Sequence, residues 1–364
     1  MDIAARLRAL AGSQGLAGIG FCGVEPFAET RGDLEAAVAS GRSGRLTFTF
    51  SDPSTASDVS RSFPWARSLI VAAHSYAADA GNPGRPKPGT ARIARFAAAD
   101  HYAPLRHALA AVASVMRTAG HRAEVLVDDN RLVDRAAAVR AGVGWWGKSS
   151  MVLVPGAGPW VLLGSVVTDA VLPSDAPMRR DCGTCSACIP ACPTGAIVAP
   201  GVIDARRCLA HWAQAPGEIP AEFRTAMGDR LYGCDECLDA CPPGYRAIGA
   251  TDAASGRVAL VPLLAMDDRR LRAAFARFYV PRNDVRYLRR NALVALGNSG
   301  SANSVGVVAG YAGHPDPLLR GHASWALGRL GGPRAYAALR LVAATDRDPG
   351  VVAEARSALA GTVG

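Results

Sequence analysis

The sequence predicts a mixed α/β part at the N-terminus, a cysteine-rich middle and an all-α C-terminal part. Three observations support this expectation. Segments with strand and helix periods alternate up to about residue 175, eight of the nine cysteines lie between residues 182 and 241, and a 32-residue repeat fills the C-terminal part. At 364 residues the chain has room for two or three domains. We place them at residues 1–175, 176–250 and 251–364.

The first part combines helices with short apolar strands. We expect helices around 3–11, 102–118 and 132–141. Strand-like runs follow at 18–22, 68–73, 124–127, 151–154 and 160–167. Such alternation favours a layered domain of the α/β or α+β class.

Nothing in the sequence predicts export or insertion into a membrane. The first residues form an amphipathic helical pattern without the apolar core of a signal peptide. The uncharged stretch 149–168 has the length of a membrane span, but Pro155, Gly156, Gly158 and Pro159 break it into two strand-like runs. Many free thiols also suit a reducing cytosol. We therefore expect a cytoplasmic monomer with no membrane partner.

The cysteines form two arrays with the spacing of iron–sulfur ligands. The first array is Cys182-x2-Cys185-x2-Cys188-x3-Cys192-Pro193, and the second is Cys208 followed by Cys234-x2-Cys237-x3-Cys241-Pro242. In a run with the spacing of the first array, the first three cysteines bind one cluster and the fourth cysteine binds the other. We therefore expect a ferredoxin-like module with two [4Fe–4S] clusters. One would be bound by Cys182, Cys185, Cys188 and Cys241, and the other by Cys192, Cys208, Cys234 and Cys237.

Two other uses of these cysteines fit less well. Zinc sites favour separated C-x2-C pairs, whereas the first array places three cysteines within seven residues. Disulfides require an oxidising compartment. The spacing therefore indicates electron transfer.

The last hundred residues contain a repeat. Asp284, Asp316 and Asp348 recur at intervals of 32, and a helical pattern ending in Ala-Leu-Gly or Ala-Leu-Ala follows each. A period in the thirties with paired helices predicts an α-solenoid of the HEAT type. An ordinary helical bundle is the alternative, because the chain has three copies only.

The charge of the chain favours a polyanionic partner. The net charge is +9, and Lys87 and Lys148 are the only lysines among 40 basic residues. Phe275, Phe278, Tyr279 and Tyr287 are interleaved with arginines between residues 266 and 291. Arginines that track phosphates and aromatic rings that stack on bases would bind nucleic acid there; a solvated helix face is the alternative. The candidate contacts are Arg269, Arg270, Arg272, Arg282, Arg286, Arg289 and Arg290.

The segment 142–149, GVGWWGKS, matches two phosphate-binding patterns by its letters. Both patterns require a strand before the loop and a helix after it. Here a helical pattern precedes the loop and an apolar β-like run follows, and two tryptophans would crowd a phosphate. We therefore expect no nucleotide site in this segment.

Two adjacent acids follow the strand-like run 124–127. Ligands are often held at strand ends in α/β domains, and a neighbouring charge and burial raise the pKa of a carboxyl group until it can donate a proton. Asp128 is the candidate acid. The alternative is structural, because Asp129 or Asn130 would cap the following helix. The residues alone leave these two roles of the acidic pair open.

Together, these motifs resemble the epoxyqueuosine reductases of tRNA modification, and the resemblance covers nearly the whole chain. The matching residues are Asp128, Arg135-Ala-x4-Ala-Gly142-x-Gly144-Trp145-x-Gly147-Lys148, the complete cysteine array with its lone Cys208, Tyr232-Gly233-Cys234-Asp235-x-Cys237, and Leu288-x-Arg290-Asn291 with Leu296-Gly297-Asn298.

The resemblance implies an enzyme that reduces epoxyqueuosine to queuosine in the tRNA anticodon loop, using cobalamin and two [4Fe–4S] clusters. The clusters would relay electrons from a donor of unknown identity, and Asp128 would protonate the departing oxygen. Cobalamin is implied by the resemblance alone. We expect it near Asp128, Trp145, Lys148, His211 and Trp212. A loop position in solvent is the alternative for Lys148, and core packing is the alternative for the His-Trp pair.

The chain departs from the family pattern around the expected pocket. Asp129, Asn130 and Arg131 stand where the family usually has Ser or Thr and then a proline, and Asp100-His101-Tyr102 replaces Asp-Tyr-His. These departures leave two other functions open. One is a corrinoid iron–sulfur reductase of a small molecule, and the other is a ferredoxin-like electron carrier that is not an enzyme.

Overall fold

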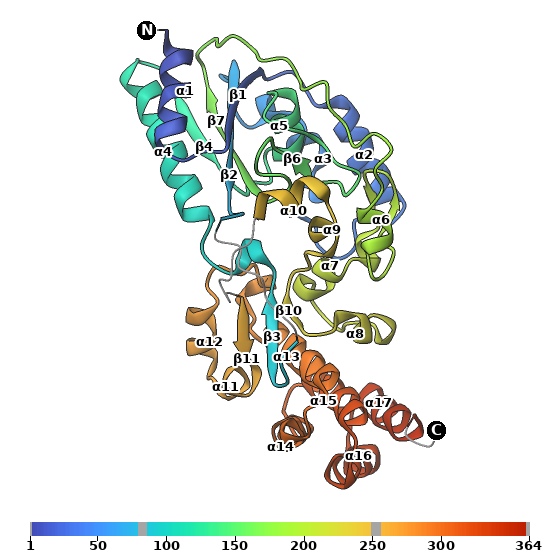
Figure 1. Ribbon diagram of the computed structural model, residues 1–364. Coiled ribbons are helices and arrows are strands. Elements are labelled where there is room, and N and C mark those ends of the chain that lie inside the picture. Colours follow the sequence, from blue (N-terminus) through green and yellow to red (C-terminus); the bar gives the residue numbers. More distant parts are fainter. Residues whose placement is uncertain (1, 79–85, 249–255, 362–364) are drawn as a thin grey trace. The chain divides into compact units, whose positions relative to one another are not determined.

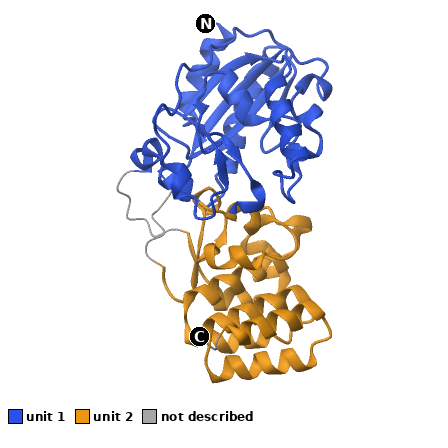
Figure 2. Cartoon of the chain, turned by 90° about the vertical axis from the view of Figure 1, so that its right-hand side faces the viewer, with its two compact units in different colours: residues 1–80, 99–208, 235–253 blue, residues 81–98, 209–234, 254–364 orange. Residues whose placement is uncertain are grey.

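The computed structural model describes residues 2–78, 86–248 and 256–361. They form two compact units, shown in Figure 2. Unit 1 contains residues 1–80, 99–208 and 235–253, and unit 2 contains residues 81–98, 209–234 and 254–364. Each unit is thus assembled from three separate stretches of the chain. The three-domain division by sequence position stays a prediction.

Unit 1 is built on a four-stranded sheet with the order β1-β2-β7-β4 (Figure 1). The strands are β1 Gly18–Gly23, β2 Ser68–Ser75, β4 Ala123–Leu126 and β7 Val161–Thr168. All three pairings are antiparallel. The mixed fold is confirmed in its α+β form, and the uncharged stretch ending at residue 168 supplies buried strand as expected.

Side chains alternate across this sheet, so both faces need a cover. Leu69, Val71 and Ala73 belong to an apolar cluster that includes residues of α5, whereas Ile70 points to the other face. Helices α1 and α4 lie on that other side (Figure 1). Their bounds are α1 Ile3–Ser13, α4 Tyr102–Thr118 and α5 Asp134–Arg140. The three helices expected in this part are therefore present.

Short elements complete unit 1. They are α2 Ala28–Ala39, α3 Pro53–Ala56, β5 Trp145–Trp146, β6 Val152–Leu153, α6 Cys188–Ala191, β8 Ile197–Ala199, β9 Val202–Ile203, α9 Glu236–Asp239 and α10 Pro242–Ile248. Helix α2 was not expected, because it buries Leu34 alone and therefore shows no apolar stripe.

Unit 2 joins a small sheet to a series of helices. The strands are β3 Thr90–Ile93, β10 Arg230–Tyr232 and β11 Arg257–Ala259, with β3 in the centre. The helices before the repeats are α7 Leu209–Gln214, α8 Ala221–Met227, α11 Leu260–Ala265 and α12 Asp268–Ala274. The repeat helices are α13 Arg286–Ser299, α14 Val305–Tyr311, α15 Pro317–Leu330, α16 Pro333–Thr345 and α17 Pro349–Ala360. Among the helices of the described residues, none is both long and apolar enough to cross a membrane.

The recurring aspartates begin helices. The side chain of Asp316 accepts a hydrogen bond from the Leu318 amide at the start of α15, and Asp348 caps α17 in the same way. Proline occupies the first helical position after each of these two caps, where its missing N–H costs nothing. The 32-residue period therefore repeats a helix start, as expected for a solenoid.

The recurring glycines allow neighbouring repeat helices to approach closely. A Cβ atom at Gly297 would lie 2.9 Å from Cα of Ala326, and one at Gly328 would lie 2.7 Å from Cβ of Ala358. Both distances are too short for a methyl group. The Ala-Leu-Gly pattern thus lets α13 pack on α15, and α15 on α17.

We expect Gly297→Ala to destabilise the repeat helices. The new methyl group clashes with α15, which costs about 1–3 kcal/mol. Gly310→Ala is the matched control, because nothing lies within 4 Å of a Cβ at that position of α14, and alanine there adds about 0.4–1 kcal/mol of stability. Native-state hydrogen exchange of the α13 and α15 amides measures both. Equal protection in the two variants would contradict the packing role of Gly297.

Candidate functional site

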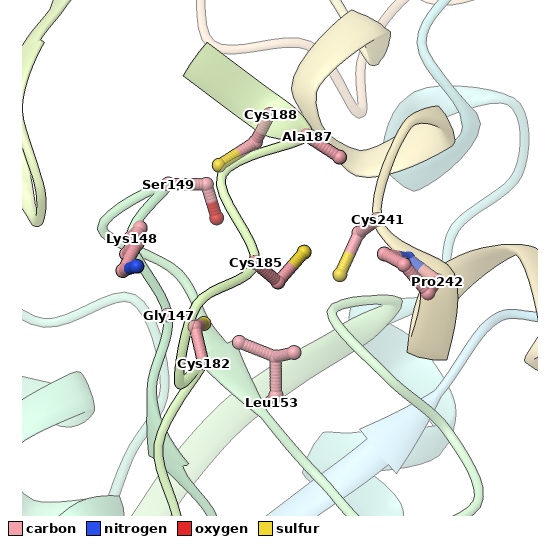
Figure 3. Close-up of a pocket in the computed structure, with 10 residues that line it drawn as sticks. All are labelled: Gly147, Lys148, Ser149, Leu153, Cys182, Cys185, Ala187, Cys188, Cys241 and Pro242. Atoms are coloured by element: carbon pink, nitrogen blue, oxygen red, sulfur yellow. The ribbon is translucent and has the colours of Figure 1, made fainter.

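Four cysteines from both arrays meet in one pocket of unit 1 (Figure 3). Cys182, Cys185 and Cys188 come from the first array, and Cys241 comes from the end of the second. The pocket contains about 260 Å³ of empty space, part of it open to solvent. Its other lining residues are Gly147, Lys148, Ser149, Leu153, Ala187 and Pro242. The structure therefore brings together the four cysteines that the spacing assigns to one cluster.

These thiols oppose one another's ionisation. Burial raises the pKa of Cys188, and the neighbouring Cys182 and Cys185 raise it further. Burial likewise raises the pKa of Cys241, as do the same three cysteines of the first array. Four thiolates in one pocket repel one another, so they need a positive charge between them. The iron ions of a cluster supply that charge and keep the ligand thiols deprotonated. The pocket thus fits a group that binds all four sulfurs.

Segment 142–149 forms one wall of this pocket. Trp145 pairs with Leu153 across the β5–β6 hairpin, and the hairpin tip carries Lys148, whose Nζ donates to the carbonyl oxygen of Gly183 at 2.7 Å. Helix α5 precedes this hairpin, so the expected order of helix before loop and strand after it is confirmed. A Cβ at Gly144 would lie 2.4 Å from the Leu153 carbonyl oxygen, which explains this glycine by packing. A sequence that matches a phosphate-binding loop thus forms a tight β-hairpin here.

The segment after Cys241 is fixed to the sheet. The buried indole Nε1 of Trp160 donates to the carbonyl oxygen of Gly244 at 2.9 Å. Gly158 has a positive φ of 58°, and a Cβ there would lie 2.8 Å from the Pro243 carbonyl oxygen. These contacts hold the last cysteine beside the first array.

The second predicted ligand set is divided between the units. Cys192, Cys208 and Cys237 belong to unit 1, whereas Cys234 ends a stretch of unit 2. Burial raises the pKa of Cys192, but hydrogen bonds from the Thr194 and Ala196 backbone outweigh it and lower the pKa overall. N–H groups directed at sulfur also tune the potential of a cluster. The assignment of this set stays a prediction.

Asp128 lies in the loop between β4 and α5. Its φ of 54° is in the left-handed region, where residues other than glycine are uncommon and often functional. The residue reaches solvent, yet surrounding protein atoms raise the pKa of its carboxyl group by desolvation, an effect that Arg106 opposes and Asp129 reinforces. The carboxyl group of Asp128 thus keeps its proton to a higher pH than an ordinary aspartate does.

Asp129 has the opposite environment. Arg131 donates from Nε to Oδ1 at 2.9 Å and from Nη2 to Oδ2 at 2.6 Å, and this pair lowers the pKa of the Asp129 carboxyl. The alternative of a helix cap is wrong, because α5 begins later, at Asp134. Two adjacent acids with opposite pKa shifts are typical of a site that needs one proton donor.

Further ionisable side chains, which the sequence analysis did not name as candidate site residues, interact electrostatically with Asp128. Burial raises the pKa of Asp134 well above its ordinary value, and both neighbouring acids raise it further. Its buried Oδ1 atom has no hydrogen-bond partner among the described residues. Burial also raises the pKa of Tyr102, to which Asp128 and Asp134 add. The sequence signal that could have pointed to Asp134 is the charged pair Asp134-Arg135 at the start of an alanine-rich helix.

The other expected cofactor residues fall into two groups. Trp145 is nearly buried, and its indole nitrogen has no hydrogen-bond partner in the described part of the chain, so it can still bind a polar ligand. His211 and Trp212 are buried in unit 2 and contact each other edge-to-face at 5.1 Å. Trp212 also stacks on Phe223. For this pair the structure shows core packing, the alternative interpretation.

The basic stretch divides into exposed and buried arginines. Arg290 is fully buried and donates to the carbonyl oxygens of Ala215 and Trp212 at 2.8 Å. Arg289 is also buried and binds Asp268. Their predicted contact with nucleic acid is wrong, because both serve inside unit 2. The arginines that remain exposed are Arg269, Arg270, Arg272 and Arg282, while Arg286 is half-buried.

The interleaved aromatic residues are mostly unavailable for stacking on bases. Phe275, Phe278 and Tyr287 are buried, whereas Tyr279 is exposed. The basic stretch therefore exposes arginines and, among these four aromatic residues, Tyr279 alone. The prediction that exposed arginines alternate with exposed aromatic rings is wrong.

Comparison with known proteins extends these observations. A family model described as a 4Fe-4S double cluster binding domain matches residues 181–244, and a model of HEAT repeats matches residues 282–360. The helical repeat prediction is thus confirmed. An epoxyqueuosine reductase of Bacillus cereus is 31% identical over 353 residues, which cover 93% of this chain and 92% of the relative.

Two solved structures are similar over 98% of both chains. One is an epoxyqueuosine reductase with a tRNA-Tyr epoxyqueuosine-modified tRNA stem loop, with a TM-score of 0.88 and 28% identity. The other is the Bacillus subtilis epoxyqueuosine reductase with its catalytic aspartate loop swung out of the active site, with a TM-score of 0.87 and 27% identity.

We expect Cys241→Ser to remove about half of the protein-bound iron, because one of two four-iron clusters loses a ligand. Adding Cys182→Ser should remove no more, since both residues line the same pocket. Cys22→Ala is the control, because this buried cysteine lies outside both arrays. Iron analysis of anaerobically purified protein measures the effect. Additive iron loss in the double variant would show that Cys182 and Cys241 serve different clusters.

Proposed function

The chain belongs to the epoxyqueuosine reductase family, and we propose that it reduces epoxyqueuosine to queuosine in tRNA with Asp128 as the proton donor. The observation that supports this most strongly is the gathering of Cys182, Cys185, Cys188 and Cys241 in unit 1. The candidate acid belongs to the same unit. Electron and proton delivery are thus built into one part of the chain.

The reaction requires two electrons and two protons. Removing the epoxide oxygen leaves a carbon–carbon double bond and releases the oxygen as water. An iron–sulfur cluster passes electrons singly, so the two clusters of the double-cluster domain hold both electrons between them. The second ligand set is proposed as Cys192, Cys208, Cys234 and Cys237. A separate electron donor would recharge the clusters between turnovers.

Asp128 is suited to deliver a proton to the leaving oxygen. An alkoxide leaves readily when an acid protonates it as the bond breaks. Crowding by protein raises the pKa of Asp128, so the carboxyl group stays protonated at higher pH than an ordinary aspartate. The paired Asp129 stays ionised beside it and does not compete for this role.

Unit 1 also has side chains that fit a polar cofactor. Asp134 and Trp145 each carry a buried polar atom that no described residue hydrogen-bonds, and such atoms require an explanation in a folded protein. We propose that Asp128, Asp134 and Trp145 face the cobalamin that family membership implies. When bound, cobalamin supplies a reduced cobalt centre for the epoxide-bearing ring.

The tRNA backbone is proposed to contact the exposed arginines before the repeats. Arg269, Arg270 and Arg272 lie on or next to α12, and Arg282 follows in the same basic stretch. Arginine binds phosphate oxygens through a planar, permanently charged group. We further expect the chain to act as a monomer in the cytoplasm, where tRNA is modified.

We expect Asp128→Asn to slow formation of queuosine by about 10²–10⁴-fold, the usual contribution of a positioned acid. Activity of the unmodified protein should fall as pH rises through the raised pKa of Asp128, because only the protonated form donates. The measurement is single-turnover conversion of epoxyqueuosine tRNA as a function of pH, with iron and cobalt contents checked in each variant. Asp129→Asn is the matched control and should retain most activity. Full activity of Asp128→Asn would contradict the assignment.

We expect Arg269→Gln with Arg270→Gln to weaken tRNA binding and to flatten its dependence on salt. Each lost phosphate contact lowers the slope of log K against log salt by roughly one. Arg6→Gln changes an exposed arginine of unit 1 and serves as the control for charge. Filter binding across a range of salt concentrations tests this. An unchanged slope in the double variant would place the tRNA on another surface.

A further inference from the structure

We propose that Lys148 raises the reduction potential of the cluster at Cys182, Cys185, Cys188 and Cys241. The inference rests on the proposed function, because it takes this pocket as a cluster site. Lys148 would change electron transfer only by its effect on the cluster, without contacting the substrate. It is therefore a positioning residue and not a catalytic one. The expected contact of Lys148 with cobalamin stays a separate prediction.

The side chain of Lys148 contacts the first array directly. Its ammonium group donates to the carbonyl oxygen of Gly183 at 2.7 Å, and Gly183 follows the ligand Cys182. Lys148 also lines the same pocket as the four thiols (Figure 3).

The backbone around Lys148 is held on two sides. The β5–β6 hairpin supports it from within unit 1, where the Gly147 amide donates to the Met151 carbonyl oxygen at 2.8 Å. The carbonyl oxygen of Lys148 itself accepts from the Gly201 amide at 2.9 Å. The ammonium group therefore extends from a fixed point, and its distance to the pocket is set by the fold.

The loop that receives Lys148 is equally well defined. The Cys185 amide donates to the Cys182 carbonyl oxygen at 2.9 Å, which closes a turn between two ligands. The Gly183 amide donates to Asp181 at 2.7 Å. Asp181 thus places a negative charge on the same turn. Among the described residues that line the pocket, Lys148 is the basic one.

A fixed positive charge favours the reduced cluster. Reduction adds one negative charge to the cluster, and a cation stabilises that state through Coulomb attraction, more strongly where protein replaces water. Removing the charge therefore lowers the reduction potential. Lys148 is half-buried, so salt should screen part of this attraction.

The residue type supports a specific role. In a chain with 40 basic residues, Lys87 and Lys148 are the only lysines. A lysine ammonium is compact and carries three donors, whereas a guanidinium is broad and planar. A single carbonyl acceptor in a narrow turn suits the smaller group.

The experiment compares cluster potentials in variants of the anaerobically purified full chain with its clusters. Lys148→Gln removes the charge but keeps an N–H donor for Gly183, and Lys148→Arg keeps the charge. Lys87→Gln is the matched control, because it makes the same charge change in unit 2. The midpoint potential of each cluster is measured by redox titration with electron paramagnetic resonance, without tRNA.

We expect Lys148→Gln to lower one of the two potentials, so that the ratio of reduced to oxidised cluster falls about tenfold at a fixed potential, equal to 59 mV for one electron. The other cluster should be unchanged. Lys87→Gln should match the unmodified protein, and Lys148→Arg, which keeps the charge on a broader group, should shift the potential by less than Lys148→Gln. Unchanged potentials in Lys148→Gln would overturn the proposal, as would an equal shift in Lys148→Arg with iron content intact.

If Lys148→Gln loses iron during purification, its cluster potential cannot be measured directly, and a second variant is needed. Lys148→Met removes both charge and donor, and a cluster rebuilt into either neutral variant with iron and sulfide is titrated in the same way. An unshifted potential after rebuilding would show a purely structural role and overturn the proposal. Failure of the proposed function would appear as a lack of queuosine formation. The potentials are measured without turnover, so the two failures can be distinguished.

Discussion

The joining of Cys241 to the first cysteine array is the constraint on which unit 1 depends. Three ligands within seven residues cannot complete a four-iron site, so the chain must return after a long excursion through unit 2. The Trp160 indole bonded to the Gly244 carbonyl at 2.9 Å fixes this return on the sheet. The sheet is thus the frame that positions the fourth sulfur.

The same frame positions the chemistry around the pocket. The hairpin that presents Lys148 follows helix α5, and Arg135 of α5 donates to the Ser150 carbonyl oxygen at the end of the hairpin turn. The loop that carries Asp128 precedes α5. The four-thiol pocket and the proposed proton donor therefore share supports, and the pKa shifts of Asp128 and Asp129 have opposite directions.

Sequence patterns predicted the features that local spacing encodes. Cysteine spacing predicted the membership of the four-thiol pocket, the 32-residue period predicted the helix starts at Asp316 and Asp348, and flanking periodicity excluded a phosphate loop at 142–149. Features that depend on distant contacts were missed. The burial of Arg290 follows from carbonyl acceptors about 75 residues earlier in the chain, and the antiparallel sheet order follows from pairing that no local pattern reveals.

The central claim is that electrons stored in the clusters of this chain remove the epoxide oxygen of tRNA. It is tested most directly by mixing chemically reduced, cobalamin-loaded protein, freed of excess reductant, with one equivalent of epoxyqueuosine tRNA. Mass spectrometry of the nucleoside and the visible spectrum of the clusters are recorded together. The account predicts a nucleoside lighter by one oxygen atom and clusters oxidised by two electrons for each queuosine formed. An unchanged nucleoside, or queuosine formed while the clusters stay reduced, would contradict it.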